Sequence, residues 1–308
     1  MSSLQCNIIQ MKPFTLWLFG TLLVTLTRAD KPYPFPENYM VAKTNSSVTL
    51  ICNTTTEEAV TWKFGNSMKK MENVRLVKHY RQDGQNLNIS DLDYPMFGNY
   101  SCWKGAEMLS SVYLFIEEDL DNIDYLQCLA KSYHCNFTCT WNNSEYIAVR
   151  LELRHDCNMR EKSCWISSSK QLPDGRFQFE ISHSLSPYVE ESTRFKVTAE
   201  AIKGNYFRKR IKTFYLRDII QPDPPKIVKC QKEGDKLNVT IDPPSTWSTP
   251  HSFFKLEYEI EYKHTDDNQV GKSQSALIPG NIWELKVHCR DSLIGSHWSQ
   301  WTPTMLIH

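Results

Sequence analysis

Short β-rich runs separated by turn residues recur along this chain and restrict the folds open to it. Each run alternates apolar and polar residues or is rich in β-branched and aromatic residues, and helical periodicity is almost absent. Short strands at this spacing predict antiparallel β-sandwiches rather than a parallel sheet with crossover helices. We therefore predict an all-β fold. The runs are SVTLIC (47–52), AVTWKF (59–64), LNIS (87–90), NYSCW (99–103), SVYLFI (111–116), FTCTW (137–141), AVRLEL (148–153), RFQFEI (176–181), RFKVTAEA (194–201), KLNVTI (236–241), FKLEYEIEY (254–262) and WELKVHC (283–289).

The runs fall into three groups, and a proline-rich segment separates the second group from the third. QPDPP (221–225) cannot continue a sheet ladder and favours an extended backbone, so we expect a semi-rigid elbow there. A length of 308 residues allows two or three domains of ordinary size. We predict a signal peptide and then three tandem β-sandwich domains, with bounds at residues 1–29, 30–118, 119–220 and 221–308.

The N-terminus has the pattern of a secretory signal peptide. Lys12 precedes an apolar run over residues 14–26, and Thr27 and Ala29 lie where a signal peptidase favours small residues. The alternative is an uncleaved anchor. No later stretch approaches the ~20 apolar residues that a transmembrane helix needs. We therefore expect a secreted, extracellular and soluble chain without a membrane span.

Glycosylation sequons and cysteines also indicate the secretory pathway. Of the ten cysteines, only Cys6 would be lost with the signal peptide, and this number is typical of an oxidising compartment. N-x-S/T sequons are markers of surface positions in secreted proteins. They occur at Asn45, Asn53, Asn88, Asn99, Asn136, Asn142 and Asn238.

The first group carries the cysteine and tryptophan spacing of the immunoglobulin fold. Trp62 follows Cys52 by ten residues, and Tyr100 lies two residues before Cys102. In that fold a buried tryptophan packs on a disulfide between facing sheets, with a tyrosine two residues before the second cysteine. A Cys52–Cys102 bond would stabilise the domain by roughly 3–4 kcal/mol in the chain-entropy model. In the second group, Cys128, Cys139 and Trp141 fit a hairpin stapled across its two strands.

The third group ends on Trp298-Ser299-Gln300-Trp301, preceded by a strand whose outward side chains are basic. A three-residue period is that of a polyproline II turn, which places both rings on one face. Alternation along the strand points Lys286, His288 and Arg290 outward. We predict a ladder of cations on the rings of Trp298 and Trp301, with His288 contributing as a cation only when protonated; each exposed contact is worth about 0.5–1 kcal/mol. Two unrelated surface tryptophans are the alternative.

Several of these features together resemble the type I cytokine-receptor ectodomain. They are Cys128…Cys139-x-Trp141, the Pro-Asp-Pro-Pro elbow and the Trp-Ser-x-Trp motif, although Thr302 stands where that family has a serine. With an immunoglobulin-like domain in front, the chain is similar to the receptor-like beta chains of interleukin-12 and interleukin-23. The resemblance covers essentially the whole mature chain and implies one immunoglobulin-like domain followed by two fibronectin type III-like domains. It rests on YSCWKGAEMLSS (100–111), LQCLAKSYHCNFTCTW (126–141), RDIIQPDPPK (217–226) and TWSTPHSFF (246–254).

The resemblance implies a secreted cytokine subunit rather than an enzyme. Such beta chains clasp a four-helix-bundle alpha chain, of interleukin-12 alpha or interleukin-23 alpha type, at the elbow between the second and third domains. The resulting heterodimer engages a cell-surface interleukin-12 receptor chain. A homodimer, a soluble decoy receptor ectodomain and an adhesion module are the alternatives.

Six residues of the elbow correspond to partner-contacting positions in that family. Asp291 matches an aspartate that pairs with an arginine of the helical partner, and such pairs are strong and directional. Phe253 and Leu293 stand at tyrosine positions, so the rim of the pocket is altered. Taken singly, each residue could instead be ordinary core or a solvated charge. The six are Tyr133, Glu190, Glu191, Phe253, Asp291 and Leu293.

The cysteines depart from the family pattern. Ser186 occupies the position of the cysteine that links family beta chains to their partner, so that interchain bond is not expected. Cys157 and Cys164 are candidates for a second-domain disulfide, and we predict a Cys230–Cys289 bond because both fall at inward positions. Cys135 is left over near Tyr133. It either links to the helical partner or a second copy, or stays a free thiol that can exchange with neighbouring cysteines.

Charge and motifs exclude other classes of function. Formal net charge is zero, with 35 basic and 35 acidic residues, so no global field selects nucleic acid or an anionic membrane. No catalytic motif and no cysteine and histidine set at zinc spacing occurs, so we expect no enzyme activity, metal or cofactor. The basic run FRKRIK (207–212) is either a heparan sulfate site or, more plainly, a solvated strand face.

Overall fold

The structure is a computed structural model that describes residues 35–52, 59–65, 77–118, 123–134, 136–153, 165–168, 170–188 and 191–307. Several sequence predictions lie outside these residues. They concern the signal peptide (1–29), the sequon at Asn53, and Cys135, Cys157, Cys164 and Glu190. Among the residues described, no helix is long and apolar enough to cross a membrane.

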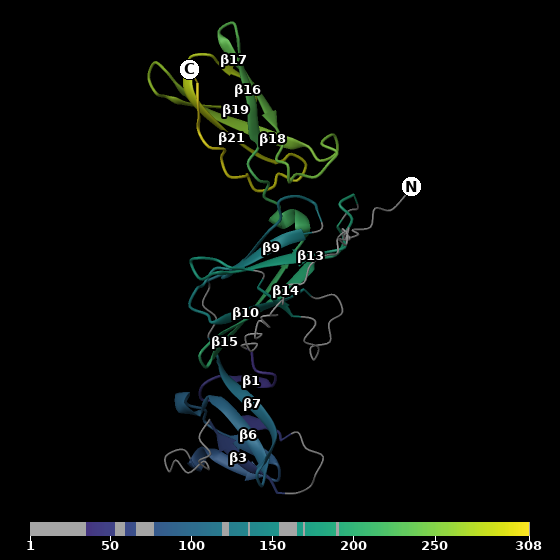
Figure 1. Cartoon of the computed structure of the whole chain (residues 1–308), viewed down its shortest axis with the longest axis vertical. Helices are drawn as coiled ribbons and strands as arrows, with labels where there is room; N and C mark the ends of the chain where they lie inside the picture. The colour runs from purple at the N-terminus through teal and green to yellow at the C-terminus, as the bar shows by residue number, and fades with distance from the viewer. Residues whose placement is uncertain are drawn as a thin grey trace, which may run out of the picture.

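The described chain is built from β-strands and short 3-10 turns, arranged as β-sandwiches that follow one another along the long axis of the molecule (Figure 1). The prediction of an all-β fold with tandem sandwiches is confirmed. The lowest sandwich in Figure 1 holds the N-terminal strands, and the uppermost holds the C-terminal ones.

The first sandwich places the sheet β2-β5-β4 against β3, β6 and β7, with β1 paired to β7. Trp62 on β3 is 3% exposed and packs in one core cluster with Cys52 and Cys102, which are joined by a disulfide. The Tyr100 hydroxyl donates to the carbonyl oxygen of Met96 at 2.6 Å. The elements are β1 (Tyr39–Ala42), β2 (Val48–Leu50), β3 (Thr61–Phe64), η1 (Val77–His79), β4 (Tyr80–Asp83), β5 (Asn86–Ile89), η2 (Tyr94–Met96), β6 (Gly98–Lys104) and β7 (Glu107–Glu117).

The second sandwich places the sheet β12-β13-β9-β8 against the strands β11-β10-β14-β15. Cys128 and Cys139 lie directly opposite each other on β8 and β9 and form a disulfide, beside the fully buried Trp141. The elements are β8 (Leu126–Leu129), β9 (Asn136–Trp141), β10 (Ala148–Leu153), β11 (Ile166–Ser167), β12 (Lys170–Gln171), β13 (Phe177–Ser182), β14 (Phe195–Lys203), β15 (Tyr206–Phe214) and η4 (Leu216–Ile219).

The third sandwich places β16-β17-β20 against β19-β18-β21-β22. Its core is a cluster of aliphatic residues on β17, β18, β20 and β21, which includes the buried Ile260 and Val287. The elements are β16 (Lys226–Glu233), β17 (Lys236–Asp242), β18 (Leu256–His264), β19 (Val270–Ser273), β20 (Leu277–Pro279), β21 (Ile282–Asp291) and β22 (Met305–Leu306).

The first two sandwiches share one sheet. β7 pairs in parallel with β15, with Ile116 opposite Tyr206 and Glu117 opposite Phe207, so the sheet continues from the first group of strands into the second. Phe115 and Phe207 belong to an aromatic cluster at this junction, together with Phe35. Apolar contact and backbone pairing therefore join these two parts directly.

The predicted Cys230–Cys289 disulfide is wrong, because both cysteines are free thiols. Cys230 lies on β16, and its Sγ is 3.8 Å from Sδ of Met305. Cys289 lies on β21 in the opposite sheet, where its Sγ is 3.7 Å from the carbonyl oxygen of Asp223. Both side chains point inward, as predicted, but each contacts a different neighbour. A disulfide requires Cβ atoms about 3.8 Å apart, and these two cysteines do not form one.

Candidate functional site

The proline elbow is tied to the second sandwich by backbone hydrogen bonds. The amide of Gln221 donates to the carbonyl oxygen of Ala130, and the amide of Ala130 donates to that of Ile219, both at 2.8 Å. An ion pair of 2.9 Å joins Lys131 to Asp223. Prolines fix φ, so this elbow is a stiff connection.

Aromatic side chains from the third part of the chain complete the core of the second sandwich. Trp247 and Phe254 are buried in the same cluster as Trp141. The ring of Tyr133 lies 5.2 Å from that of Phe254 and 6.0 Å from that of Trp247, and the Tyr133 amide donates to Oγ of Ser248 at 3.1 Å. The elbow thus brings Tyr133 against the TWSTPHSFF segment.

Asp291, at the end of β21, is a buried carboxylate at this junction and is only 2% exposed. Its Oδ1 accepts the amides of Leu293 at 2.7 Å and Ile294 at 3.2 Å. It also hydrogen-bonds the side chain of Tyr133, and the pKa of Tyr133 is raised first by burial and then by the charge of Asp291. The Tyr133 hydroxyl therefore stays protonated and can donate to the carboxylate.

Three apolar or aromatic side chains near Asp291 and the half-buried Tyr133 are exposed. Phe253 is 56% exposed, Leu293 83% and Tyr188 49%. The Tyr188 ring lies 5.6 Å from those of Phe253 and Phe254, and its hydroxyl donates to the carbonyl oxygen of Thr249 at 3.1 Å. Contacts therefore run from Leu293 through Asp291, Tyr133 and Phe254 to the exposed rings. We call this set the elbow surface: Tyr133, Tyr188, Phe253, Asp291 and Leu293.

Glu191 lies close to the elbow surface and is mostly buried. Its Oε2 accepts the amide of Arg217 at 3.3 Å and is 3.8 Å from the guanidinium of the same residue, whereas the buried Oε1 has no hydrogen-bond partner. Burial raises the pKa of Glu191, and the contacts with Arg217 only partly oppose this. The Glu191 charge also raises the pKa of Tyr133.

The Trp-Ser-x-Trp segment lies over β21 as a stack of rings and cations. The His288 ring is stacked between Trp298, at 4.1 Å, and Trp301, at 3.6 Å. Lys286 Nζ lies 4.7 Å from the centroid of Trp301, and Arg290 Cζ lies 4.6 Å from that of Trp298. Burial lowers the pKa of His288, so this rung is a neutral ring at neutral pH.

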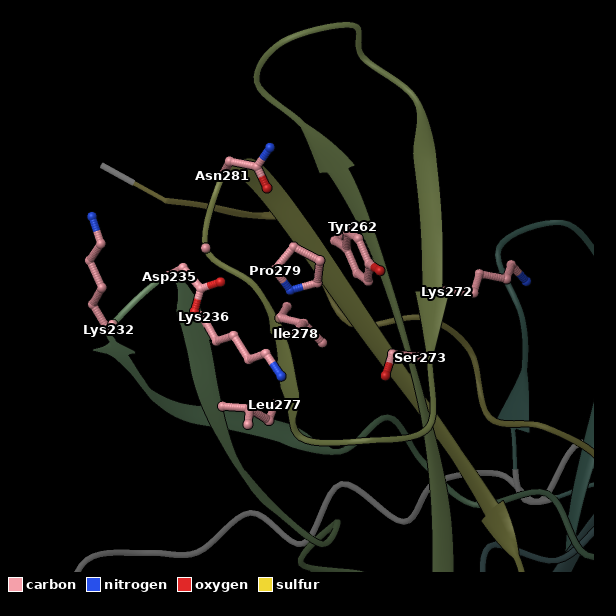
Figure 2. A pocket seen from close by; sticks show the side chains of 12 residues that line it. Lys232, Asp235, Lys236, Tyr262, Lys272, Ser273, Leu277, Ile278, Pro279 and Asn281 are labelled. Atoms are coloured by element: carbon pink, nitrogen blue, oxygen red, sulfur yellow. The ribbon is translucent and has the colours of Figure 1, made fainter.

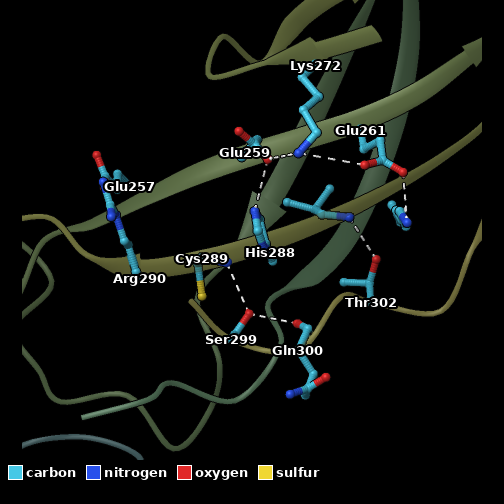
Figure 3. Close-up of polar contacts among 12 residues, drawn as sticks. Glu257, Glu259, Glu261, Lys272, His288, Cys289, Arg290, Ser299, Gln300 and Thr302 are labelled. Carbon is cyan, nitrogen blue, oxygen red and sulfur yellow. Dashed lines mark hydrogen bonds and ion pairs between the residues drawn. The ribbon is translucent and has the colours of Figure 1, made fainter. Parts of the chain in front are cut away.

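Sequence reasoning missed the acidic side of this stack. On β18, Glu257, Glu259 and Glu261 lie opposite Arg290, His288 and Lys286. Each carboxylate pairs with the residue opposite it, and Lys272 on β19 also bonds Glu259 at 2.8 Å (Figure 3). The available signal was a glutamate at every second position of FKLEYEIEY, which places all three on one face of a strand.

A further groove lies on the third sandwich, away from the elbow. A groove of about 770 Å³ between β17, β19 and β20 is lined by Lys232, Asp235 and Lys236 among others (Figure 2). No group of histidine, cysteine and carboxylate side chains that could hold a metal occurs among the described residues. The basic run on β15 is paired internally, because Arg208 bonds Glu118 at 2.7 Å and Lys212 bonds Asp124 at 2.8 Å.

The chain has relatives of known name. Residues 123–203 match the family model described as "Cytokine interleukin-12p40 C-terminus". Over 288 residues the chain is 28% identical to interleukin-12 subunit beta of Felis catus, which covers 82% of this chain and 84% of the relative. The protein of the same name from Ovis aries is 26% identical over 321 residues, and that from Equus caballus is 25% identical over 323 residues. Both alignments cover 94% of this chain and 95% of the relative.

Proposed function

Because the chain is similar over most of its length to interleukin-12 beta subunits, we propose that it is the receptor-like half of a two-chain cytokine. Its relatives are cytokine subunits, and so is this chain; it is not an enzyme. In the proposal it is secreted and binds a four-helix-bundle alpha chain of interleukin-12 alpha or interleukin-23 alpha type. The pair then engages a cell-surface interleukin-12 receptor chain, with residues 30–118, 119–220 and 221–308 acting as an immunoglobulin-like and two fibronectin type III-like domains.

The observation that carries this proposal is the elbow surface. The buried carboxylate of Asp291 and the half-buried Tyr133 side chain lie at the same junction as the exposed Phe253 and Leu293. Binding energy in protein interfaces concentrates where apolar and aromatic side chains surround a desolvated polar pair. Asp291 uses Oδ1 for the two backbone amides, and a carboxylate can accept further hydrogen bonds, as from a partner's guanidinium.

The elbow also presents this surface in a preformed state. Its backbone hydrogen bonds, the Lys131–Asp223 ion pair and the shared aromatic core fix the second and third sandwiches to each other. A preorganised surface loses less entropy on association, which favours a long-lived complex over a transient one. A subunit that travels with its partner needs such a complex.

The affinity of the chain for helical alpha chains tests the proposal. A Phe253→Ser, Leu293→Ser variant removes exposed apolar groups without touching the core. We expect the variant to bind the alpha chain about 30-fold more weakly, because two interface anchors together contribute roughly 2 kcal/mol. Affinity of the purified chains by surface plasmon resonance is the measurement.

A matched control is available at the far end of the third sandwich. Val270 and Leu306 are each 55% exposed and lie on β19 and β22. Val270→Ser, Leu306→Ser should leave the affinity unchanged. If the elbow variant, secreted and folded, bound every alpha chain as tightly as the control does, the elbow would not be the binding site.

A further inference from the structure

A groove separate from the elbow surface lies between the second sandwich and the proline segment, residues 221–224. Its volume is about 350 Å³. The floor is the outer face of the sheet β8-β9-β13, which contributes Gln127, Thr138, Thr140 and Gln178. The wall is the elbow from Gln221 to Pro224, together with Gln300 of the Trp-Ser-x-Trp segment. The lining is therefore mostly amides and hydroxyls, with proline rings beside them.

Strand alternation on β9 explains this floor. Phe137, Cys139 and Trp141 are buried, so their neighbours along the strand point away from the core. The outward positions are Asn136, Thr138, Thr140 and, just past the strand, Asn142. Asn136 and Asn142 are both sequons, and they stand at opposite ends of the same face.

Asn142 is part of the groove lining, and its amide is held in place. Nδ2 donates to Oε1 of Gln127 at 3.3 Å, and Oδ1 accepts from Nη1 of Arg176 at 3.3 Å. Arg176 is itself oriented by Asp174, with Nε 2.7 Å from Oδ2. A glycosylated asparagine keeps one N–H on Nδ2, so both of these contacts are compatible with the modification.

We propose that an N-linked glycan on Asn142 seats its first sugars in this groove and braces the elbow. In the secretory pathway, Nδ2 of Asn142 bonds to the anomeric carbon of a lipid-pyrophosphate-linked oligosaccharide. The bond between that carbon and the pyrophosphate breaks, the lipid pyrophosphate leaves, and the amide loses one proton. Sugar hydroxyls then meet the amides and hydroxyls of the floor, while the apolar faces of the rings meet Pro222 and Pro224.

Asn136 provides the contrast on the same strand. It is six positions away, which is about 20 Å at ~3.3 Å per residue, it is exposed, and it does not line the groove. A glycan there projects into solvent. The inference requires secretion, which belongs to the proposed function, but it does not depend on any alpha chain.

Site-specific deglycosylation of the full chain, secreted from animal cells, tests the proposal. Glycopeptide mass spectrometry should find Asn142 occupied. An endoglycosidase acting on the folded protein should release the Asn142 glycan about tenfold more slowly than the Asn136 glycan, because two hydrogen bonds of ordinary net strength disfavour the exposed state by about that factor. After denaturation the two rates should be equal. Thr140→Ala, Gln178→Ala should speed release at Asn142 only.

A second measurement follows hydrogen exchange at the backbone amides of the elbow. Ser144→Ala removes the sequon without changing Asn142, and hydrogen exchange at the Ala130 and Gln221 amides should then quicken. Asn136→Gln should leave that exchange unchanged. An unoccupied Asn142, equal release rates in the folded chain, or unaltered exchange in Ser144→Ala would each overturn the inference. Glycans on the other sequons would show that the chain is secreted, so that a negative result at Asn142 would count against this inference and not against the proposed function.

Discussion

At the scale of single residues, His288 shows how burial decides the role of a side chain. The sequence suggested a cation between two tryptophans. In the structure, the ring is 8% exposed and stacked on both indoles, and burial lowers its pKa. The hydrogen bond to Glu259 and the charge of Glu261 act in the opposite direction, while Lys272 adds to the lowering. The neutral ring is thus the form that the fold favours.

Stability should therefore fall as pH falls. Unfolded, His288 takes up its proton near pH ~6.5, but the folded protein resists protonation until lower pH. The unfolded chain then binds more protons, so the free energy of unfolding decreases below about pH 6.5. His288→Phe keeps an aromatic ring in the stack and should flatten this dependence in urea unfolding curves measured between pH 7.5 and 5.

The dependence should not vanish in His288→Phe, since burial also lowers the pKa of His183. Replacing the exposed His297 by Phe is the matched control and should leave the slope as it is. An identical slope in His288→Phe and in the unsubstituted chain would show that folding does not lower the pKa of His288.

At the scale of elements, the tryptophan segment is bound to β21 by its hydroxyls. The amide of Val287 donates to Oγ1 of Thr302 at 3.0 Å, and the amide of Cys289 donates to Oγ of Ser299 at 3.1 Å. In return, the amides of Thr302 and Ser299 donate to the carbonyl oxygens of Val287 and Cys289 at 2.8 Å. The hydroxyls of Thr302 and Ser299 thus accept the β21 amides that a neighbouring strand would otherwise bond.

Thr302 therefore serves as well as the serine that stands there in the related receptor family. Thr302→Ser should leave the free energy of unfolding nearly unchanged. Thr302→Val keeps the shape but leaves the buried Val287 amide without an acceptor, which should cost about 1–3 kcal/mol. Denaturant unfolding of the two variants decides this, and equal stability would mean that the hydroxyl is dispensable.

The elements differ in how far the sequence could predict them. The spacing of Cys52, Trp62 and Cys102 is that of a known fold, and the bonded Cys128 and Cys139 lie on one hairpin. The local sequence pattern was therefore enough to predict both disulfides. For Cys230 and Cys289, alternation gave the correct face but could not give the distance between two sheets. The parallel pairing of β7 with β15 joins residues about ninety positions apart, and no local pattern encodes it.

The elbow surface shows the same limit. The resemblance pointed to Tyr133, Phe253, Asp291 and Leu293, and the structure places them along one junction. Tyr188 was missed because its contact with Phe253 depends on how a loop of the second sandwich meets a loop of the third. The composition of either loop alone does not predict that meeting.

At the scale of the whole molecule, the first two sandwiches are joined by their shared sheet and by hydrogen bonds between Tyr39 of the first and a buried ion pair of the second. Arg150 on β10 bonds Glu200 on β14 at 2.6 Å, and both side chains are less than a tenth exposed. The guanidinium also donates to the hydroxyl of Tyr39 from the first sandwich at 2.8 Å and lies 4.3 Å from the ring of Phe35. This cluster spans the junction between the two parts.

Removal of one charge from this pair should weaken the junction more than removal of both. Arg150→Met leaves Glu200 buried with the Tyr39 hydroxyl and with Lys209 at 3.9 Å, and should destabilise the chain by about 3 kcal/mol. Arg150→Met, Glu200→Met replaces both charges by apolar groups and should recover most of that loss. Urea unfolding followed by tryptophan fluorescence measures both variants. If the double variant were no more stable than the single one, the hydrogen bonds of the pair, rather than the cost of an unpaired carboxylate, would hold the first two sandwiches together.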